Sequence, residues 1–265
     1  MNFISQNLAI LVPAVLFIIL ASTEIFLPRR KLNLSRKGRW FTHAIFLGTN
    51  NIIGRLLVFL IIVPSAANWA NENQFGLFHW IDTGFWVAAI LSVILLDFAV
   101  WFQHRIMHKH PLLWRLHSVH HSDRDLDVTS ALRFHPLELI VSTLYKSACV
   151  ILLGVPLEVA IFFEIWLNAN AMFNHSNIKL PHKLDAIMRV LIVTPDMHIV
   201  HHTTHMNEQN SNYGFALSIW DRLFNSYNAQ PRDGHDGLII GLEEAQDAGP
   251  SQPIWSLLLP FRNGN

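Results

Sequence analysis

Long apolar runs, separated by short polar segments, constrain the fold of this chain more than any other feature. About 20 apolar residues in a row can cross the hydrocarbon core of a bilayer as one helix. Lipid cannot hydrogen-bond to a bare backbone, so such segments cross it as helices. The sequence therefore predicts an all-α, multi-pass transmembrane helical bundle. The runs cover residues 8–27, 40–64, 85–102, 137–153 and 157–173.

Basic residues orient these runs relative to the membrane. A short basic loop beside a span marks the cytoplasmic side, whereas the loop at 65–84 contains no Lys or Arg. Counting crossings from the basic loop then places the end of the third run on the cytoplasmic side. The first run is a weaker match to a signal peptide, because no basic segment precedes it. The basic residues after it are Arg29, Arg30, Lys31, Arg36, Lys37 and Arg39.

Gly154 and Pro156 separate the last two runs and predict a helical hairpin. The hairpin either crosses fully or re-enters, which leaves four crossings or three plus a re-entrant hairpin. In both cases its two ends face one side, so His175 returns to the side of His104. Short loops without an evident targeting signal favour a bacterial inner membrane, with organellar membranes as the alternative.

Composition agrees with a membrane protein and excludes some other classes. Hydrophobic residues make up 51% of the chain and charged residues 14%, against about a quarter charged in soluble domains. The formal net charge of zero gives no overall attraction to nucleic acid. A single cysteine, Cys149, excludes an internal disulfide framework.

Three histidine sets hold eight of the 16 histidines. Histidines four residues apart share one face of a helix. Neutral imidazole suits Fe, Cu, Ni and Zn, and eight imidazoles exceed the three or four protein ligands of one zinc. The sets therefore predict two metal ions in a cytosolic, histidine-rich cap. They comprise His104 and His108, then His117, His120 and His121, then His198, His201 and His202.

The residues between these histidines exclude two familiar metal sites. A zinc protease would use HExxH, and a soluble di-iron bundle would use Glu-x-x-His. Here Arg105 and Ser118 follow the first histidine of their sets, and no set contains glutamate. Two other functions remain open: a membrane metal-binding or transport protein without catalysis, and a zinc-dependent membrane hydrolase with a carboxylate base.

The order HxxxH, HxxHH, HxxHH resembles the fatty acid hydroxylase and sterol desaturase superfamily of membrane histidine-box di-iron proteins. The resemblance covers residues 95–226 and divides the chain into an N-terminal transmembrane hairpin with its basic loop (1–84), a di-iron domain (85–227) and a C-terminal tail (228–265). Other stretches that agree are Asp97, Leu113-Trp114-Arg115, residues 133–138, His175-Ser176-Asn177, Asn212-Tyr213-Gly214 and residues 220–224.

The resemblance implies two iron ions that activate O2 and attack a lipid C–H bond, in a fatty acyl chain, a sterol or a related lipid, with hydroxylation or desaturation as the outcome. Electrons would come from a separate redox protein, since the chain has no G-x-G-x-x-G cofactor motif. The implied metal ligands are His104, His108, His117, His120, His121, His175, His198, His201 and His202.

Six further polar residues are candidates for orienting those ligands or completing a site. Asn170 and Asn174 stand near places where some family members have histidines, which leaves the coordination of one metal open. For the others the alternative is an ordinary structural contact: a polar contact between helices, a salt bridge or a hydrogen bond to backbone. The six are Asp97, His135, Glu138, Asn170, Asn174 and Asp196.

Overall fold

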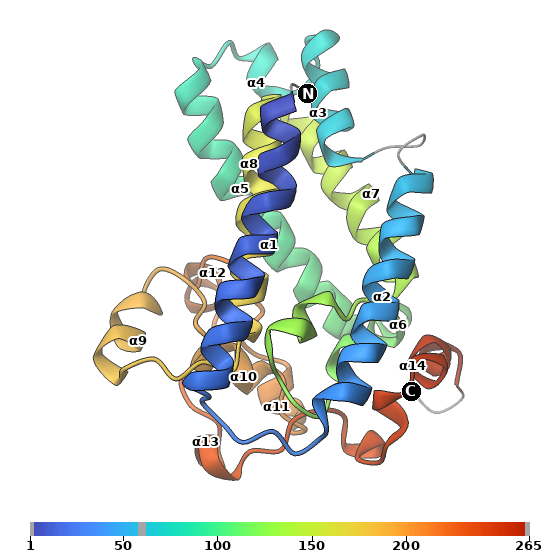
Figure 1. Cartoon of the computed structure of the whole chain (residues 1–265). Helices are drawn as coiled ribbons and strands as arrows, with labels where there is room; N and C mark the ends of the chain where they lie inside the picture. The colour runs from blue at the N-terminus through green and yellow to red at the C-terminus, as the bar shows by residue number, and fades with distance from the viewer. Residues whose placement is uncertain (1–2, 58–61, 263–265) are drawn as a thin grey trace.

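A computed structural model describes the backbone of residues 3–57 and 62–262 and the side chains of residues 11–54 and 62–262. Within these residues the fold consists of helices and turns, and β-structure is limited to isolated bridges. The prediction of an all-α fold is therefore confirmed. The long helices are α1 (Phe3–Phe26), α2 (Arg36–Leu57), α5 (Phe85–Lys109), α7 (Pro136–Leu153) and α8 (Leu157–His175) (Figure 1).

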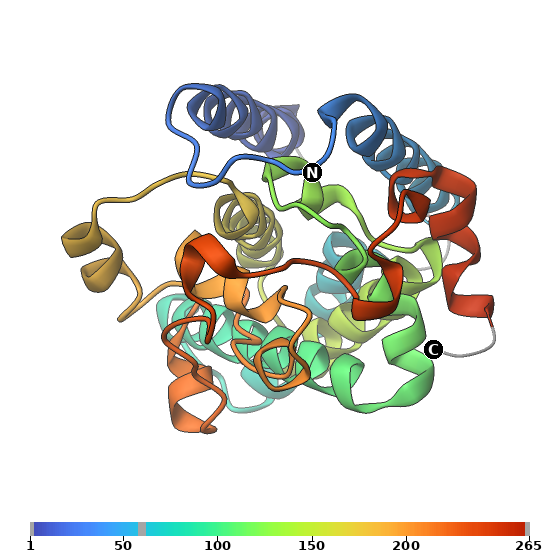
Figure 2. The ribbon, with the colours of Figure 1, turned by 90° about the horizontal axis from the view of Figure 1, so that it is seen from below.

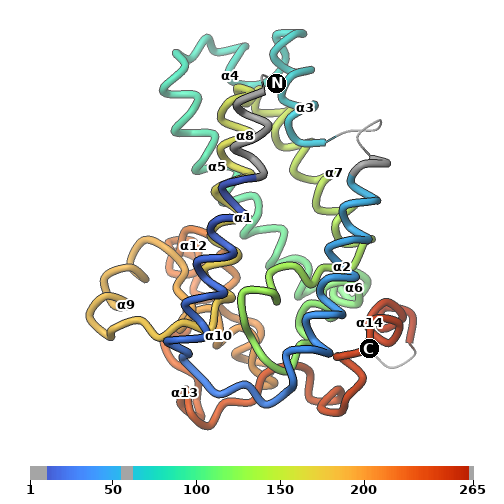
Figure 3. The backbone as a smooth tube through the Cα atoms, in the orientation of Figure 1, coloured from blue at the N-terminus to red at the C-terminus, as the bar shows by residue number. Residues whose placement is uncertain are grey.

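Short helices cap both ends of these long ones. Helices α3 (Val63–Glu72) and α4 (Leu77–Trp80) lie at the end where α7 turns into α8. The other short helices lie in the lower half of Figure 1, where α5 and α8 end (Figure 3). They are α6 (Pro111–His121), α9 (His182–Met188), α10 (Pro195–His201), α11 (Met206–Gln209), α12 (Ile219–Leu223), α13 (Gly234–Gly237) and α14 (Pro253–Leu258), with 3-10 turns at Val128–Leu132, Glu243–Ala245, Gly249–Ser251 and Leu259–Phe261.

Two helices of the described residues, α5 and α7, are long and apolar enough to cross a membrane, and α1 contains a shorter apolar stretch, Leu11–Phe26. Helix α8 has the length of a span but falls short in hydropathy, because glutamates and asparagines interrupt its apolar surface. The predicted run at 40–64 corresponds in part to α2, and residues 58–61 lie outside the described residues.

The predicted loop at 65–84 is wrong, because most of it is helical. Alanines with high helix propensity form the buried face of α3: Ala66, Ala67 and Ala70 are each at most 2% exposed. This face packs on α7 and α8, within a core that includes Leu96 of α5 and Phe163 of α8. Ser65, Asn68 and Glu72 of the same helix are exposed.

The hairpin of α7 and α8 is confirmed at the predicted turn. Gly154 ends α7 with a φ of +69°, a conformation that glycine adopts without strain. A Cβ on Gly76, itself at φ +109°, would lie 2.3 Å from the backbone nitrogen of Gly154. Glycine is thus required on both sides of this contact, which fixes α4 against the turn.

Two further sets of contacts hold the lower half of the molecule together. Leu20 of α1 contacts Ala171 and Met172 of α8 in a second core. Seen from below, the segment from α13 to α14 crosses the lower face of the molecule (Figure 2). It is tied there by backbone hydrogen bonds from Thr204 to Ile239 and from Gly241 to His202. This segment covers the end of α10.

Candidate metal centre

The nine predicted ligand histidines gather into two clusters at the lower ends of α5, α6, α8 and α10. Within each cluster, one ligand nitrogen per residue lies within 4.8 Å of all the others. Whether they bind metal stays a prediction. The first cluster comprises His104, His108, His117, His121 and His201, and the second comprises His120, His175, His198 and His202.

Helical geometry explains how two helices serve both clusters. Residues four apart share a face, whereas adjacent residues point about 100° apart around the helix. Helix α6 therefore gives the first cluster a pair, His117 and His121, and gives the second cluster His120. The turn at α10 does the reverse, since His198 and His202 enter the second cluster and His201 enters the first.

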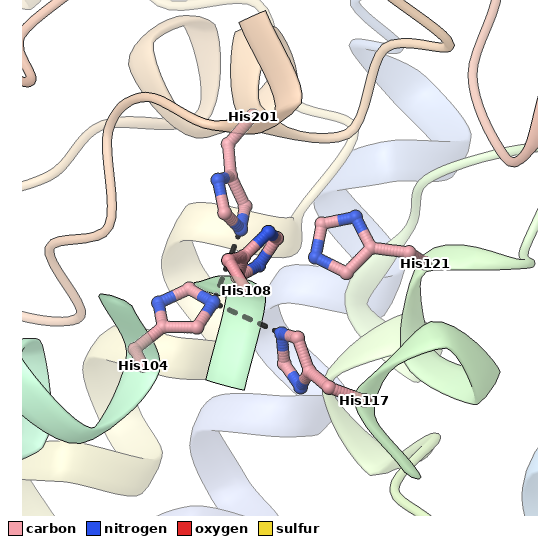
Figure 4. Close-up of side chains that lie close together, drawn as sticks. All are labelled: His104, His108, His117, His121 and His201. Atoms are coloured by element: carbon pink, nitrogen blue, oxygen red, sulfur yellow. Dashed lines mark hydrogen bonds between the residues drawn. The ribbon is translucent and has the colours of Figure 1, made fainter. Parts of the chain in front are cut away.

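In the first cluster the Nε2 atoms of three imidazoles face one another (Figure 4). The Nε2 of His104 lies 3.0 Å from that of His117 and 3.1 Å from that of His201. Two nitrogens bound at right angles to one ion, each about 2.1 Å from it, would be about 3.0 Å apart. The observed spacing therefore fits imidazoles arranged around a single cation.

The other ring nitrogens of these three histidines show which atoms are free to bind. Each Nδ1–H donates outward: His104 to the carbonyl of Tyr213 at 2.7 Å, His201 to that of Ser211 at 2.7 Å, and His117 to Glu138 Oε1 at 2.6 Å. A neutral imidazole carries one N–H, so each Nε2 presents a lone pair. Three lone pairs that converge with no proton between them repel one another unless a cation lies among them.

The second cluster has four imidazoles, and their Nε2 atoms are similarly spaced. The Nε2 of His175 lies 3.0 Å from that of His120 and 3.1 Å from that of His198, and His202 Nε2 lies 3.2 Å from His198 Nε2. His175 donates its Nδ1–H to the carbonyl of Ala171 at 2.7 Å. The donor set of both clusters is therefore nitrogen only, which suits a transition metal rather than Mg²⁺ or Ca²⁺.

Burial keeps these imidazoles in the neutral form that binds metal. Burial and the neighbouring His117 lower the pKa of His201 to about 3. Burial and His202 likewise lower the pKa of His121 well below its usual value, and burial and His175 do the same for His120. Near neutral pH these three imidazoles are therefore neutral and available as nitrogen ligands.

Of the six predicted supporting residues, Glu138 contacts a cluster histidine directly. The others pair elsewhere in the described residues. Asp97 accepts a hydrogen bond from Trp220 Nε1 at 2.7 Å. This is a polar contact between helices, the alternative to a role in orienting a histidine ligand. His135 accepts from the backbone of Leu137 and donates to the carbonyl of Leu257. Asp196 is held by Arg29 at 2.8 Å, Asn170 donates to the carbonyl of Trp166, and Asn174 to that of Phe215.

The sequence could not identify the backbone carbonyls that orient the histidines, because every residue type has a backbone carbonyl. One of them, on Tyr213, lies in a loop held by Asp221. That carboxylate accepts from the backbone N–H groups of Tyr213 and Gly214 and from Trp101 Nε1. Asp221 therefore fixes the position of the carbonyl that accepts from His104.

A cavity of about 320 Å³ begins at the first cluster and extends between α5, α7 and α8. His104, His117 and Glu138 line its closed end, and Val100, Leu139 and Leu167 contribute apolar wall. A ligand in this cavity would lie beside the first cluster. The second cluster does not line it.

Glu138→Gln is expected to lower the metal affinity of the first cluster by roughly 10-fold, because the charge that holds His117 in orientation is lost while the shape is kept. Metal titration of the purified full chain measures this. The control is Glu244→Gln, a change at an exposed position. Equal affinities for the two variants would contradict a role for Glu138 in positioning His117.

The sequence of the chain is similar to those of several proteins named for lipid hydroxylation or monooxygenation. A family model described as fatty acid hydroxylase matches residues 89–226. The chain is 35% identical over 151 residues to an ornithine lipid hydroxylase of Rhizobium tropici, a match that covers 54% of this chain and 42% of the relative. It is 27% identical over 167 residues to an alkylglycerol monooxygenase of Homo sapiens, covering 61% of this chain and 34% of the relative.

A more distant similarity extends to a very-long-chain aldehyde decarbonylase of Oryza sativa subsp. indica, 26% identical over 140 residues and covering 52% of this chain and 53% of the relative. The matched region thus spans less than half the length of the first two relatives. No solved structure matches the chain.

Proposed function

Because the chain belongs to the fatty acid hydroxylase family, we propose that it is a membrane enzyme that uses two iron ions and O2 to oxidise a lipid C–H bond. Relatives named for lipid hydroxylation and monooxygenation support lipid oxidation as the broad activity. The observation that carries the finer proposal is the pair of all-imidazole clusters, one of which lies at the closed end of an apolar-walled cavity.

The donor set and the burial of the clusters fit iron in this role. Bound iron would supply the redox capacity that O2 chemistry requires and that Zn²⁺ lacks. The nine imidazoles would hold the ions, and Glu138 orients His117. The walls formed by Val100, Leu139 and Leu167 exclude water and hold an alkyl segment near His104. Positioning of this kind brings a reacting C–H bond within reach of the centre.

The proposed setting is a bacterial inner membrane, which α5 and α7 cross, with α1, α2 and α8 completing a multi-pass bundle. Large apolar side chains on the outside of the long helices support it, such as Ile18 at 62% and Trp86 at 76% exposed. The basic loop after α1 reaches the histidine end, where Arg29 binds Asp196 and Arg30 donates to the carbonyl of Leu238. By the positive-inside rule that end faces the cytoplasm, where a separate redox protein would deliver electrons.

Lipid mass spectrometry tests this proposal. The purified, iron-loaded chain is incubated with an electron donor, ¹⁸O2 and either an ornithine lipid or an alkylglycerol, the lipid classes named for its relatives. A gain of one ¹⁸O atom is expected for hydroxylation, and a loss of two hydrogens for desaturation. Lipid cleavage that proceeds without O2 in the zinc-loaded protein would overturn the proposal in favour of a hydrolase.

A further inference from the structure

Helix α9 turns its polar side inward, the reverse of a surface helix on a soluble protein. Asp185 and Arg189 are buried and form an ion pair one turn apart. Thr194 Oγ1 donates to Asp185 at 2.6 Å, and Arg189 donates to the carbonyl of Ala229 at 2.9 Å. Polar contacts therefore hold the inner side of α9 to the rest of the chain.

The outer side of α9, together with the turn that follows it, is apolar. Leu184 is 44% exposed, Ile187 71% and Leu191 68%. Their spacing of three and four residues places them in one stripe along the helix. A contiguous stripe of large apolar side chains on a surface marks a site that binds lipid or another protein.

The chain enters α9 beside the end of α1. The N–H of Arg29 donates to the carbonyl of Asn177 at 2.9 Å, and the N–H of Lys179 donates to that of Leu27 at 3.2 Å. The start of α9 is therefore tied to the point where the apolar run of α1 ends. Phe26 and Leu27 at that point are themselves exposed apolar residues, as expected for a surface that faces lipid.

The chain leaves α9 beside α5. The N–H of Ser218 donates to the carbonyl of Leu191 at 3.0 Å, and the neighbouring N–H of Leu217 donates to Asp97 of α5 at 3.3 Å. Asp97 lies near the end of the apolar run at 85–102. Both ends of α9 are thus tied to the lower ends of apolar runs, and α9 itself projects outward from the other helices (Figure 2).

The exposed charges beside the stripe are basic. Lys179 and Lys183 are exposed, and neither forms an ion pair with another described residue, whereas Asp185 is buried. A lysine stem can lie along apolar surface while its ammonium reaches the phosphate layer. A symmetric contact between two copies of the chain would instead bring the same basic surface against itself. The charges therefore favour phospholipid over a second copy.

We propose that α9 is an interfacial membrane anchor. Its stripe of Leu184, Ile187 and Leu191 lies at the boundary between headgroups and acyl chains of the cytoplasmic leaflet, and Lys179 and Lys183 bind lipid phosphate. This inference rests on the proposed membrane setting and does not depend on lipid oxidation. Because α10 begins directly after this segment, the anchor would also hold the third histidine set at a fixed depth.

Spin labels on the full chain in phospholipid bilayers measure this depth by power saturation, because O2 concentrates in lipid while a nickel chelate stays in water. Single cysteines are introduced in a Cys149→Ala background, which removes the one native thiol. A label at Ile187→Cys is expected about 5–10 Å below the lipid phosphates. Ile18→Cys on the outside of α1 is the reference for lipid, and Glu244→Cys on the lower face is the reference for water.

The other outcomes separate failure of the anchor from failure of the membrane setting. Nickel access at Ile187 equal to that at Glu244, with Ile18 in lipid, would overturn the anchor and leave the setting intact. A label at Ile187 shielded from both reagents would overturn it in favour of a protein contact. Nickel access at Ile18 and Ile187 alike would overturn both proposals.

An acidic residue in the stripe is expected to withdraw α9 from the bilayer. With the label at Leu184→Cys, adding Ile187→Asp should raise nickel access and shift the label toward water, because a carboxylate is costly among acyl chains. Met206→Asp places the same charge on a similarly exposed apolar position of α11 and should leave the depth unchanged. Both variants should unfold in detergent at the same denaturant concentration, since both positions are exposed. Equal label depths in the two variants would overturn the anchor.

Discussion

His121→Ala and His120→Ala, two changes at adjacent positions, are expected to empty different metal sites. His121 belongs to the first cluster and His120 to the second, so each variant should retain about one metal ion where the wild type is proposed to hold two. Lipid oxidation should fall at least about 100-fold in both, because even outer residues that support metal ligands contribute 10- to 100-fold. Metal analysis of the purified protein together with product formation measures the result.

The double variant is expected to be no less active than the single ones, because residues that act as a unit give non-additive losses. His182→Ala provides the control, since His182 is exposed and outside both clusters. Two ions retained in either single variant would contradict the assignment of neighbouring histidines to separate sites. Equal loss of both ions in both variants would instead show that the sites fill only together.

Arg39→Met is expected to lower the free energy of unfolding by roughly 3–5 kcal/mol, because it leaves buried carboxylates without a partner. The guanidinium is fully buried and binds Asp123 through two nitrogens at 2.8 Å and Asp127 at 2.7 Å. Burial alone would raise the pKa of Asp123, but Arg39 and His43 outweigh it and hold that pKa well below its usual value. The carboxylate is therefore ionised in the wild-type protein, and removing the arginine leaves a buried acid without its main partner.

Denaturant unfolding of the purified protein in detergent measures this loss. Lys37→Met, which removes an exposed charge two residues earlier on α2, should change the free energy of unfolding by no more than about 0.5 kcal/mol. Adding Asp123→Asn and Asp127→Asn to Arg39→Met should restore part of the stability, because the stranded charges are then gone. A cost below about 1 kcal/mol for Arg39→Met would show that these carboxylates are not desolvated as the structure has them.

The parts of the fold that the sequence predicted are those with a strong local signal. The apolar runs form helices, and at the predicted turn α7 ends before Gly154 and α8 begins after Pro156. Histidines four apart, such as His104 and His108, came to one cluster because a helix repeats its face at that spacing. Family resemblance added His175, which no local repeat marks.

The features that the sequence did not predict depend on contacts between residues that are far apart in the chain. Helix α3 was read as a loop, since its alanines look unremarkable until they meet α7 and α8. The division of His120 and His121 between clusters depends on how α6 is turned relative to α10. Asp97 and Asp196 were candidates for orienting histidine ligands, but in the structure Trp220 donates to Asp97 and Arg29 forms an ion pair with Asp196. Lys146 and Glu164, 18 residues apart, meet because the hairpin folds back.

The sharing of α6 and α10 between the two clusters couples their assembly. Rotation of α6 about its axis moves His121 and His120 in concert, so a twist that improves one coordination shell also displaces a donor of the other. A metal ion bound in one cluster, as proposed, would therefore hold α6 in the rotation that the other cluster also requires. Loss of the proposed ion from one cluster would then weaken binding at the other cluster without emptying it.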